Sequence, residues 1–600
     1  MKKVLILFAL LLIPSQVLGL KISNPQIVTS MRAEVTQTDT IYLSGNIQIL
    51  ELNFSIPQED DYQEIEFLEV SDQRGICNTN LCSYEFVYDK FRNRLLKITW
   101  RNPQDDIELK VRSIVSVKMR RSLDYKTFPE FLLPTPLVQS TDEEIAELAS
   151  KARGTDFEKV AFLSKWINQN IEYDRVYSII NLSAKEILRT KKGVCDEFSN
   201  LLVSFLRNLG YYSGVAVGFV YPGRIYTGEN FQPHGWTEVY VDDGISADPT
   251  WSEVGYIDAT HIKFGVFPDS SWSFGTITAK GDLSTRVLLG EMNTEIKLLN
   301  IEEKPIIDFE TNLLESGVWK DYAVIKSDLS TDGCILTKVN VKSCTDTHGN
   351  EFLEIVDRDD IVYFCNKKSF FSIFKIPESI DPMSVYNCTI AVFPYAGEQK
   401  NVPLTISYRK SGDTKLTVSK TTLTPGEEVS VNAPNSHIFT DFGEYGFGNL
   451  EFLSPYNDFT VYSYNSGDLD KKKISVVITK PLEISLSSND TVILGSNIPV
   501  NIIIRNLQNE SQIVRVRFRE YIETERISDN KTFVFYFTPA NVEDNLIQVF
   551  VSTADYSTSD SKIVTVVKET NLLENVVQSL TRLISDFLNW LSESFKLIFK

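Results

Sequence analysis

The chain has 600 residues, which is too long for one hydrophobic core, so its length predicts several domains. A hydrophobic fraction of 42% and an aromatic fraction of 11% can fill such cores, and this excludes a mostly disordered chain. The formal net charge of -20 argues against a phosphate-binding surface as the main activity. We therefore expect no nucleic-acid partner.

The first residues have the three parts of a secretory signal. Met1 to Lys3 supply positive charge, Val4 to Ile13 form a short apolar run, and Val17 to Gly19 end on a small residue. The alternative is an N-terminal membrane anchor, but the apolar run falls short of the roughly twenty residues that span a bilayer as a helix. We predict a signal peptide over residues 1–19 and an exported, extracellular or cell-surface protein.

Cysteine usage favours an oxidising compartment. Of the seven cysteines, Cys77 and Cys82 form a close pair, four others form a cluster, and Cys195 is left over. The members of the cluster are Cys334, Cys344, Cys365 and Cys388. Their three possible pairings stay open. Six paired cysteines and one free thiol are typical of a secreted protein with a reactive cysteine.

Two hydrophobic periods divide the first half of the chain. Residues 20–125 alternate polar and apolar side chains and predict an N-terminal β domain. Residues 138–300 place helices first and strands after, the pattern of an α+β domain. Thr141 with Glu144, and Ser183 with Glu186, are expected to open helices as capping boxes.

A further helix is expected directly after Cys195, ending at Gly210. Its apolar residues recur at helical spacing: Phe198, Leu201, Leu202, Phe205, Leu206 and Leu209. Strand-like runs follow over residues 215–221, 235–241 and 245–247.

The second half of the chain predicts β modules. We expect a cysteine-containing β domain over residues 301–410 and two β-sandwich modules of the Ig-like kind over 411–480 and 481–568. Residues 571–600 form an amphipathic pattern with aromatic and basic residues near the end. We expect this C-terminal helix to bind a membrane surface or a partner helix, and packing on the last β module is the alternative.

Three residues form a candidate reactive site. A cysteine attacks a carbonyl carbon as the thiolate, which a helix N-terminus and a neighbouring imidazole favour. Cys195 stands at the predicted helix start. Of the four histidines, His234 is best placed as a general base because it begins a strand-like run. Asp248, on the next strand after a turn at residues 242–244, would orient that histidine.

The segments around these residues are Gly193-Val194-Cys195-Asp196-Glu197, Pro233-His234-Gly235-Trp236-Thr237-Glu238-Val239 and Ala247-Asp248-Pro249-Thr250-Trp251. In order and spacing they resemble the three motifs of the transglutaminase-like superfamily, over roughly residues 141–267. The resemblance implies a papain-like fold in the α+β domain. It also implies that Cys195 is the nucleophile, His234 the general base and acid, and Asp248 the orienting carboxylate.

The sequence departs from the family pattern at two places. Ser199 stands where the family usually has Ala, and Gly214-Val215 stand where an Ala-Arg pair is common. Both departures change packing or substrate contacts rather than the triad. His261 lies in a segment that resembles one of microbial members, and we expect it to be structural or to support the triad. Three aromatics are expected in the cleft or, more commonly, in the core: Trp236, Trp251 and Tyr173.

A triad of this kind performs acyl transfer through a thioester. We expect an extracytoplasmic enzyme that acts on protein or peptide amide bonds, and a protease in preference, because no calcium loop of the animal crosslinking enzymes is recognisable. A crosslinking transglutaminase is one alternative, and a non-catalytic adhesion or scaffold protein is another. No metal-ligand spacing or phosphate-binding loop is found, so no cofactor or metal is expected. His348 and His437 are interpreted as surface residues.

Overall fold

The computed structural model describes residues 27–568, with gaps at 124–127, 223–229, 242–243, 272–274, 346–350, 357–359, 380, 382, 478–479, 509–510, 520, 541–544 and 554–555. The predicted signal peptide and the predicted helix over 571–600 lie outside the described residues, as does His348. Strands dominate the described chain, and its helices fall between Pro129 and Asn208. None of these helices has the length and apolarity to cross a membrane.

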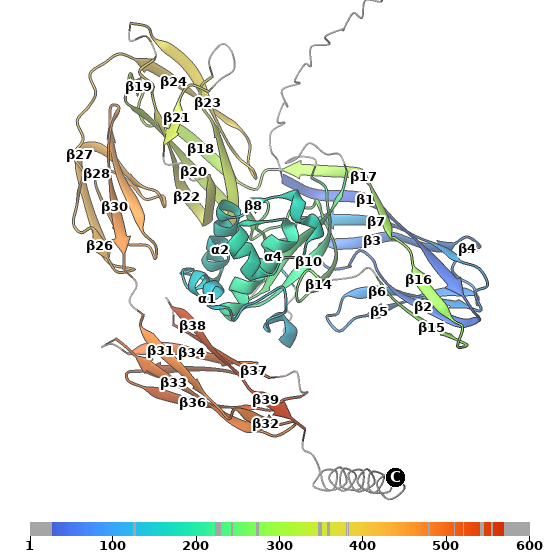
Figure 1. Cartoon of the computed structure of the whole chain (residues 1–600). Coiled ribbons are helices and arrows are strands. Elements are labelled where there is room, and N and C mark those ends of the chain that lie inside the picture. Colours follow the sequence, from blue (N-terminus) through green and yellow to red (C-terminus); the bar gives the residue numbers. More distant parts are fainter. Residues whose placement is uncertain are drawn as a thin grey trace, which may run out of the picture.

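Two sheets form the N-terminal region (Figure 1). Their strands are β1 (Ile27–Ser44), β2 (Ile47–Ser55), β3 (Gln63–Asp72), β4 (Gly75–Ile76), β5 (Cys82–Tyr88), β6 (Arg94–Arg101), β7 (Ile107–Lys118), β15 (Gly275–Gly281), β16 (Arg286–Leu289) and β17 (Asn293–Lys304). One sheet has the order β16-β1-β7-β3-β4, with β17 also on β1, and the other has the order β15-β2-β6-β5. Inward side chains such as Leu52, Trp100 and Leu109 form the core between them. The disulfide Cys77–Cys82 closes the loop before β5.

Residues 275–304 complete these N-terminal sheets. β17 pairs antiparallel with β1 from Lys304 opposite Ile27 to Asn293 opposite Thr38, and β15 pairs with β2. The expected α+β domain of residues 138–300 therefore ends earlier than its predicted boundary. The physical reason is that β1 and β2 each offer a hydrogen-bonding edge, which the alternating strands after residue 274 occupy. The helical region is thus inserted between β7 and β15.

The inserted region has four α-helices and an antiparallel sheet. The helices are α1 (Glu143–Ala149), α2 (Asp156–Asn170), α3 (Ala184–Thr190) and α4 (Cys195–Asn208), with short 3-10 turns η1 (Pro129–Phe131) and η2 (Arg175–Ile179) and a two-strand pair of β8 (Glu172–Tyr173) and β9 (Lys192–Gly193). The sheet has the order β14-β10-β11-β12-β13. Its strands are β10 (Tyr212–Val220), β11 (Gln232–Tyr240), β12 (Ile245–Asp248), β13 (Glu253–Val254) and β14 (His261–Phe267).

The helix starts test the capping predictions. The box of Ser183 with Glu186 is confirmed at α3. The prediction that Thr141 caps α1 in a box with Glu144 is wrong by one residue. The N-cap is Asp142, whose side chain accepts the Glu144 amide at 2.9 Å. Aspartate accepts this bond as well as threonine does, so the neighbouring residue could replace the predicted one.

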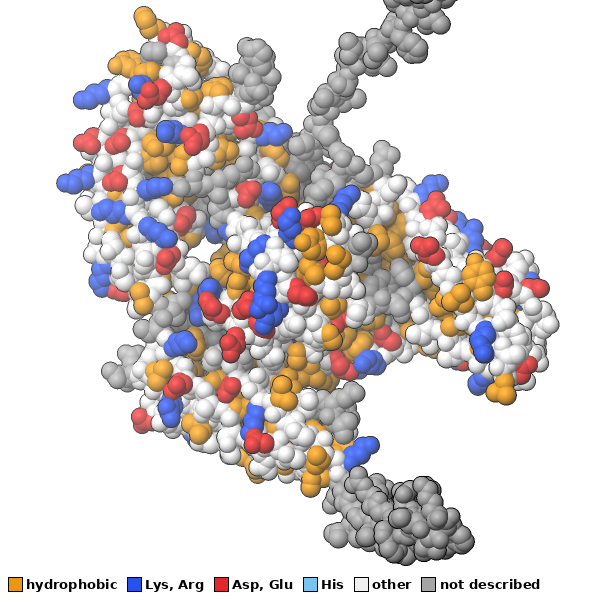
Figure 2. Space-filling model, viewed as in Figure 1, with side chains coloured by type: hydrophobic (Ala, Val, Ile, Leu, Met, Phe, Trp, Pro, Cys, Tyr) orange, Lys and Arg blue, Asp and Glu red, His pale blue; other side chains and the backbone are white. Residues whose placement is uncertain are grey.

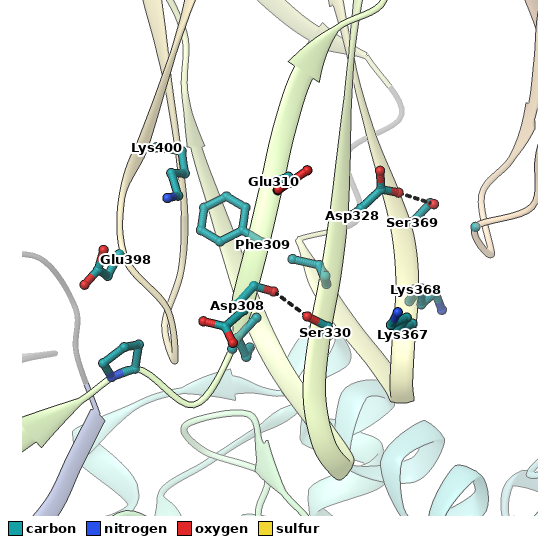
Figure 3. Close-up of a pocket in the computed structure, with 14 residues that line it drawn as sticks. Asp308, Phe309, Glu310, Asp328, Ser330, Lys367, Lys368, Ser369, Glu398 and Lys400 are labelled. Atoms are coloured by element: carbon teal, nitrogen blue, oxygen red, sulfur yellow. Dashed lines mark hydrogen bonds between the residues drawn. The ribbon is translucent and has the colours of Figure 1, made fainter.

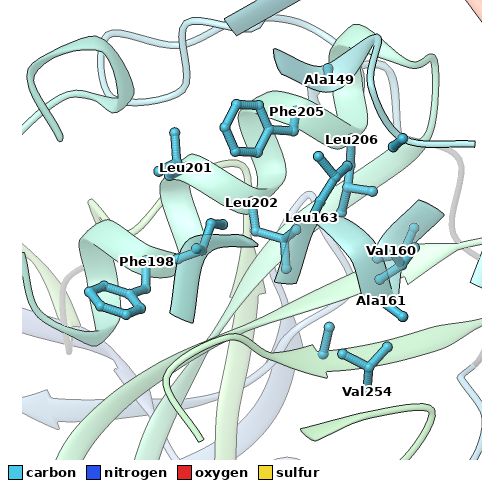
Figure 4. Close-up of a cluster of buried hydrophobic side chains, with 14 of the residues drawn as sticks. Ala149, Val160, Ala161, Leu163, Phe198, Leu201, Leu202, Phe205, Leu206 and Val254 are labelled. Carbon is cyan, nitrogen blue, oxygen red and sulfur yellow. The ribbon is translucent and has the colours of Figure 1, made fainter. Parts of the chain in front are cut away.

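The apolar side of α4 packs against α2 (Figure 4). Leu201, Leu202, Phe205 and Leu206 meet Leu163 in one cluster, and each of these five side chains is 0% exposed. All six apolar positions predicted along this helix are buried. Their burial fixes the axis of α4 and therefore the place of Cys195 at its first turn.

The sheet of the inserted region continues into the next domain through β13, where Val254 lies opposite Leu336 of β20. The strands of this domain are β18 (Asp308–Leu313), β19 (Gly317–Val318), β20 (Tyr322–Lys342), β21 (Glu354–Val356), β22 (Ile361–Lys375), β23 (Tyr386–Pro394) and β24 (Lys400–Ser407). Of the three pairings left open, the structure has Cys334–Cys365 and Cys344–Cys388.

Two further β regions follow. The first holds β25 (Thr417–Val418), β26 (Thr422–Leu423), β27 (Glu428–Thr440), β28 (Tyr445–Leu453), β29 (Phe459–Asn465) and β30 (Asp468–Val476). The second holds β31 (Leu482–Ser487), β32 (Thr491–Ile493), β33 (Ile498–Asn506), β34 (Gln512–Phe518), β35 (Tyr521–Ile527), β36 (Lys531–Phe537), β37 (Leu546–Ser552), β38 (Ser557–Ile563) and β39 (Thr565–Val567). In the second, sheets β31-β33-β36 and β35-β34-β37-β38 share one apolar core.

Aromatic rings take part in the packing of both β regions. In the first, His437 is half-buried rather than a plain surface residue, because its ring packs on Tyr445 and Phe447. In the second, Arg517 lies over the ring of Tyr212 in the inserted region, 5.6 Å from its centroid. In the face shown in Figure 2, acidic and basic side chains are interspersed over all of these regions.

Candidate active site

Cys195 is the first residue of α4 and is 8% exposed. It is the one free cysteine among the residues described. The Glu197 carboxylate accepts the Val194 amide at 3.0 Å and so caps the helix directly before the thiol. The Ser199 hydroxyl lies 2.9 Å from the Cys195 carbonyl oxygen and 3.0 Å from that of Gly235. Ser199 therefore links the first turn of α4 to β11.

His234 lies between Cys195 and Asp248. The Nε2 atom of His234 is 2.8 Å from Asp248 Oδ2, and the thiol of Cys195 is its other hydrogen-bonding neighbour. Because Nε2 faces the carboxylate, Nδ1 is the ring nitrogen that remains for the thiol. Asp248 Oδ1 accepts the amides of Thr250 at 2.8 Å and Trp251 at 3.3 Å, which fixes the carboxylate. The three residues predicted as a triad are thus brought together.

Charge and burial act against each other at this site. Burial opposes protonation of His234, but the charges of Asp248 and Cys195 and their hydrogen bonds raise its pKa to about 9. Burial likewise opposes ionisation of Asp248, yet the charge of His234 and the bonds from both histidines hold its pKa well below the usual range. The His234–Asp248 pair is therefore an imidazolium and a carboxylate at neutral pH.

His261 supports Asp248 from the other side. Its Nε2 lies 3.4 Å from Asp248 Oδ2 and its Nδ1 lies 3.1 Å from Asp258 Oδ1. Burial opposes its protonation, and its bonds to both carboxylates raise the pKa of His261 to about 9. Glu253 Oε2 accepts the Asp258 amide at 3.1 Å, and burial raises the pKa of Glu253. We call Cys195, His234, Asp248 and His261 the reactive cluster.

Aromatic rings enclose the histidines of the reactive cluster. The centroid of His234 is 5.2 Å from that of Trp251, and His261 is 5.1 Å from both Trp236 and Trp251. Tyr173 has a different place: it is exposed, contacts Phe198 and pairs in register with Gly193, two residues before the thiol.

A second buried polar group lies on the same two strands, β11 and β14. Lys263 Nζ is 3.2 Å from Glu238 Oε1 and 2.7 Å from Asp60 Oδ2, and Arg120 Nη1 is also 2.7 Å from Asp60 Oδ2. All four side chains are almost fully buried. We call these residues the ion-pair cluster. Asp60 and Arg120 come from the N-terminal region, so the cluster joins that region to the inserted sheet.

Two other places deserve comparison with the reactive cluster. A groove of about 750 Å³ near Phe309 is lined by acids and bases of the 301–410 region, such as Asp308 and Lys400, and by none of the reactive residues (Figure 3).

His234, Asp248 and His261 bring possible metal-ligand atoms within 4.8 Å of one another. In this structure these atoms bond to one another instead.

The geometry defines a class of site: a buried thiol at a helix N-terminus, next to a histidine that a carboxylate orients. A family model described as the transglutaminase-like superfamily matches residues 143–254. This part of the chain is therefore a transglutaminase-like domain, as its three motifs predict. No curated protein matches the chain.

Several solved structures are similar in part. A protein from Cytophaga hutchinsonii with an inferred assignment as a cysteine protease is 17% identical, covering 46% of this chain and 93% of its own, with a TM-score of 0.33. A bacterial ice-binding adhesin is 12% identical over 44% of this chain and 99% of its own, with a TM-score of 0.16. Alpha-2-macroglobulin of E. coli is 8% identical over 88% of this chain and 40% of its own, with a TM-score of 0.15. Scores this low carry no functional assignment.

Proposed function

We propose that this protein is an extracytoplasmic cysteine-dependent acyl-transfer enzyme that acts on protein or peptide amide bonds, most simply as a protease. The supporting observation is the placement of His234 between the Cys195 thiol and Asp248. Cys195 is the nucleophile, His234 the general base and acid, and Asp248 the carboxylate that orients the imidazole.

In the proposed reaction His234 has already taken the proton of Cys195 and holds it at Nδ1, and the sulfur attacks the carbonyl carbon as the thiolate. Asp248 stabilises the imidazolium through the bond at Nε2. The proposal assigns stabilisation of the oxyanion to backbone amides at the first turn of α4. His234 then gives its proton to the leaving amine, which leaves a thioester on Cys195. Attack by water on the thioester completes hydrolysis, and attack by an amine completes transamidation.

Export is part of the proposal, and three disulfides support it. We also propose that residues 411–480 and 481–568 are Ig-like modules that present the enzyme or bind its substrate. For 481–568, the two sheets around one apolar core support this assignment. The helix over 571–600 is proposed to bind a membrane surface or a partner helix, on its amphipathic pattern alone.

The test is incubation of the full chain with a casein-like protein and a labelled primary amine, with Cys195→Ala as the matched control. The proposal expects fragments from the wild type and none from Cys195→Ala. Amine incorporation without fragments would show that the activity is transamidation and not hydrolysis. Equal and negligible activity of both proteins on a broad substrate panel would favour the scaffold alternative.

A further inference from the structure

Few large apolar side chains are exposed in the described part of the inserted region, and all of them lie in one segment. Across residues 129–267 they are Tyr173, Val176 and Ile180, with exposed fractions of 40%, 70% and 46%. Single exposed apolar residues are ordinary on a protein surface. Three of them within residues 173–180, with none elsewhere in the described part of the region, indicate an interaction site. We call these three residues the apolar patch.

The segment that carries the apolar patch is bound to the loop that leads into the proposed nucleophile. Tyr173 of β8 pairs in register with Gly193 of β9, two residues before Cys195. The Asp174 amide donates to the Gly193 carbonyl oxygen at 3.0 Å. The 3-10 turn η2, which carries Val176, also lies against β9. The apolar patch therefore begins next to the residues that precede the thiol.

Phe198 connects the apolar patch to the side of α4 that carries the thiol. Residues three apart in a helix are neighbours on its surface, so Cys195 and Phe198 lie on one face of α4. The ring of Tyr173 packs edge-on against that of Phe198, with 6.0 Å between the centroids. Phe198 is buried and Tyr173 is exposed, so the tyrosine is the ring that a molecule approaching Cys195 can contact.

Ion pairs and a helix cap hold this segment in place. Lys192 Nζ lies 3.1 Å from Asp174 Oδ2 and 3.4 Å from Glu172 Oε2. Asp174 Oδ1 also accepts the Val176 amide at 3.1 Å and so caps the start of η2. A surface that is ordered before its ligand arrives loses less conformational entropy on binding. The apolar patch thus has the fixed backbone that a substrate-binding surface needs.

We propose that the apolar patch binds an apolar side chain of the acyl-donor peptide, aliphatic or aromatic, next to the amide that Cys195 attacks. The inference rests on the proposed function and adds the class of substrate, which is a protein segment with an apolar residue beside the scissile bond. Contact with Tyr173 and Val176 removes apolar surface of both partners from water, whereas a charged side chain would lose hydration there. This contact also orients the amide for attack.

The test compares two alkylating reagents on the full chain, N-benzyl iodoacetamide and iodoacetamide. In both reactions the Cys195 thiolate forms the S–C bond and iodide leaves. Each rate is divided by the rate of the same reagent with free cysteine, so that the ratio of the two reports binding beside the thiol. We expect the benzyl reagent to be favoured about tenfold. Val176→Ser should lower this ratio, and the double variant with Tyr173→Ser should bring it close to one.

The matched control is Val385→Ser, which removes an exposed valine from the 301–410 region and should leave the ratio unchanged. Val176→Ile keeps an apolar side chain and should keep the preference. The same ratio in the wild type and the double variant would overturn the inference. So would a preference that disappears as protein concentration rises, because a second copy of the chain would then cover the apolar patch.

Peptide cleavage separates this inference from the proposed function. With a mixture of casein-derived peptides, the wild type should cut beside apolar residues, and the double variant should lose that preference. If the benzyl reagent is favoured but no acyl transfer is found with any peptide, the binding site stands and the proposed function fails. If peptides are cut without regard to the neighbouring residues, the proposed function stands and the inference fails.

Discussion

The reactive cluster and the ion-pair cluster use the same two strands for different purposes. β11 carries His234 and Glu238, and β14 carries His261 and Lys263. Both clusters are buried and hydrogen-bonded, and both combine cations with carboxylates. They differ in the residues that carry the positive charge: histidines in the reactive cluster, and lysine and arginine in the ion-pair cluster.

The difference in residue type suits the reactive cluster to proton transfer and the ion-pair cluster to structural support. Histidine changes charge near neutral pH, so a buried histidine next to a thiol can take and return a proton. Lysine and arginine ordinarily keep their charge at neutral pH. Burial opposes ionisation of Asp60, yet the charges of Lys263 and Arg120 hold its pKa well below the usual range. Burial of charged groups is therefore common to both clusters, and the residue type of the cations distinguishes them.

The largest expected effect is in the reactive cluster. Cys195→Ala should lower acyl-transfer activity more than about a thousandfold, since the nucleophile is lost. The melting temperature should stay close to that of the wild type, because the substitution is small and His234 keeps its charged partner Asp248. Activity assays with thermal melting as the companion measurement check both parts. Residual activity at a tenth of the wild-type level would contradict the role of Cys195.

Lys263→Met should lower stability and leave activity unchanged, the reverse of the result expected for Cys195→Ala. Removal of one partner leaves Asp60 and Glu238 buried with too little positive charge, and this costs about 3–5 kcal/mol of unfolding free energy. Denaturant unfolding measures the loss, with Lys297→Met on the exposed side of β17 as the control. Activity per folded molecule should be retained. Loss of activity in a fully folded variant would show that the two clusters act together in function.

The pH dependence of stability should come from the reactive cluster. His234 and His261 have pKa values of about 9 in the folded state against about 6.5 when unfolded. A raised pKa stabilises fully below the unfolded value and loses its contribution as pH rises through the folded value. Unfolding free energy should therefore fall by roughly 3–7 kcal/mol between about pH 6.5 and 9. A curve that stays flat in the wild type would argue against protonated histidines. His261→Gln should reduce the slope and leave the part that comes from His234.

The smallest effect is expected at Ser199. Ser199→Ala removes the hydroxyl that links α4 to β11 and should cost about 1 kcal/mol. Activity should remain within a few-fold of wild type, because the hydroxyl bonds backbone carbonyl oxygens rather than the side chains of Cys195, His234 or Asp248. Unfolding and activity measurements on this one variant test both statements. A hundredfold loss of activity would give Ser199 a direct role in placing Cys195.

The sequence was informative where the signal is local. Cys195, His234 and Asp248 each stand in a short motif, and the apolar spacing after Cys195 is enough to predict a buried helix. The α4 positions were predictable because one helix repeats its period several times. The cap of α1 was not, because Thr141 and Asp142 are both good capping residues and only packing selects between them.

Contacts between strands that are distant in the chain could not be predicted from the sequence. The bond of His261 to Asp248 depends on the pairing of β14 with β10, and the space for the Asp196 carboxylate depends on the missing side chain at Gly235 of β11. Asp60 and Lys263 are separated by some two hundred residues and carry no shared motif. The pairing of β17 with β1 is equally remote, which is why the predicted domain boundary was misplaced.

That pairing affects how the chain folds during synthesis. Until residues 275–304 have left the ribosome, β1 and β2 lack the partners that cover their edges, and such edges pair readily with other chains. The whole transglutaminase-like domain must emerge during this interval. A nascent chain is therefore exposed to edge pairing while its transglutaminase-like domain is being made, and truncation before Gly275 would leave the exposure permanent.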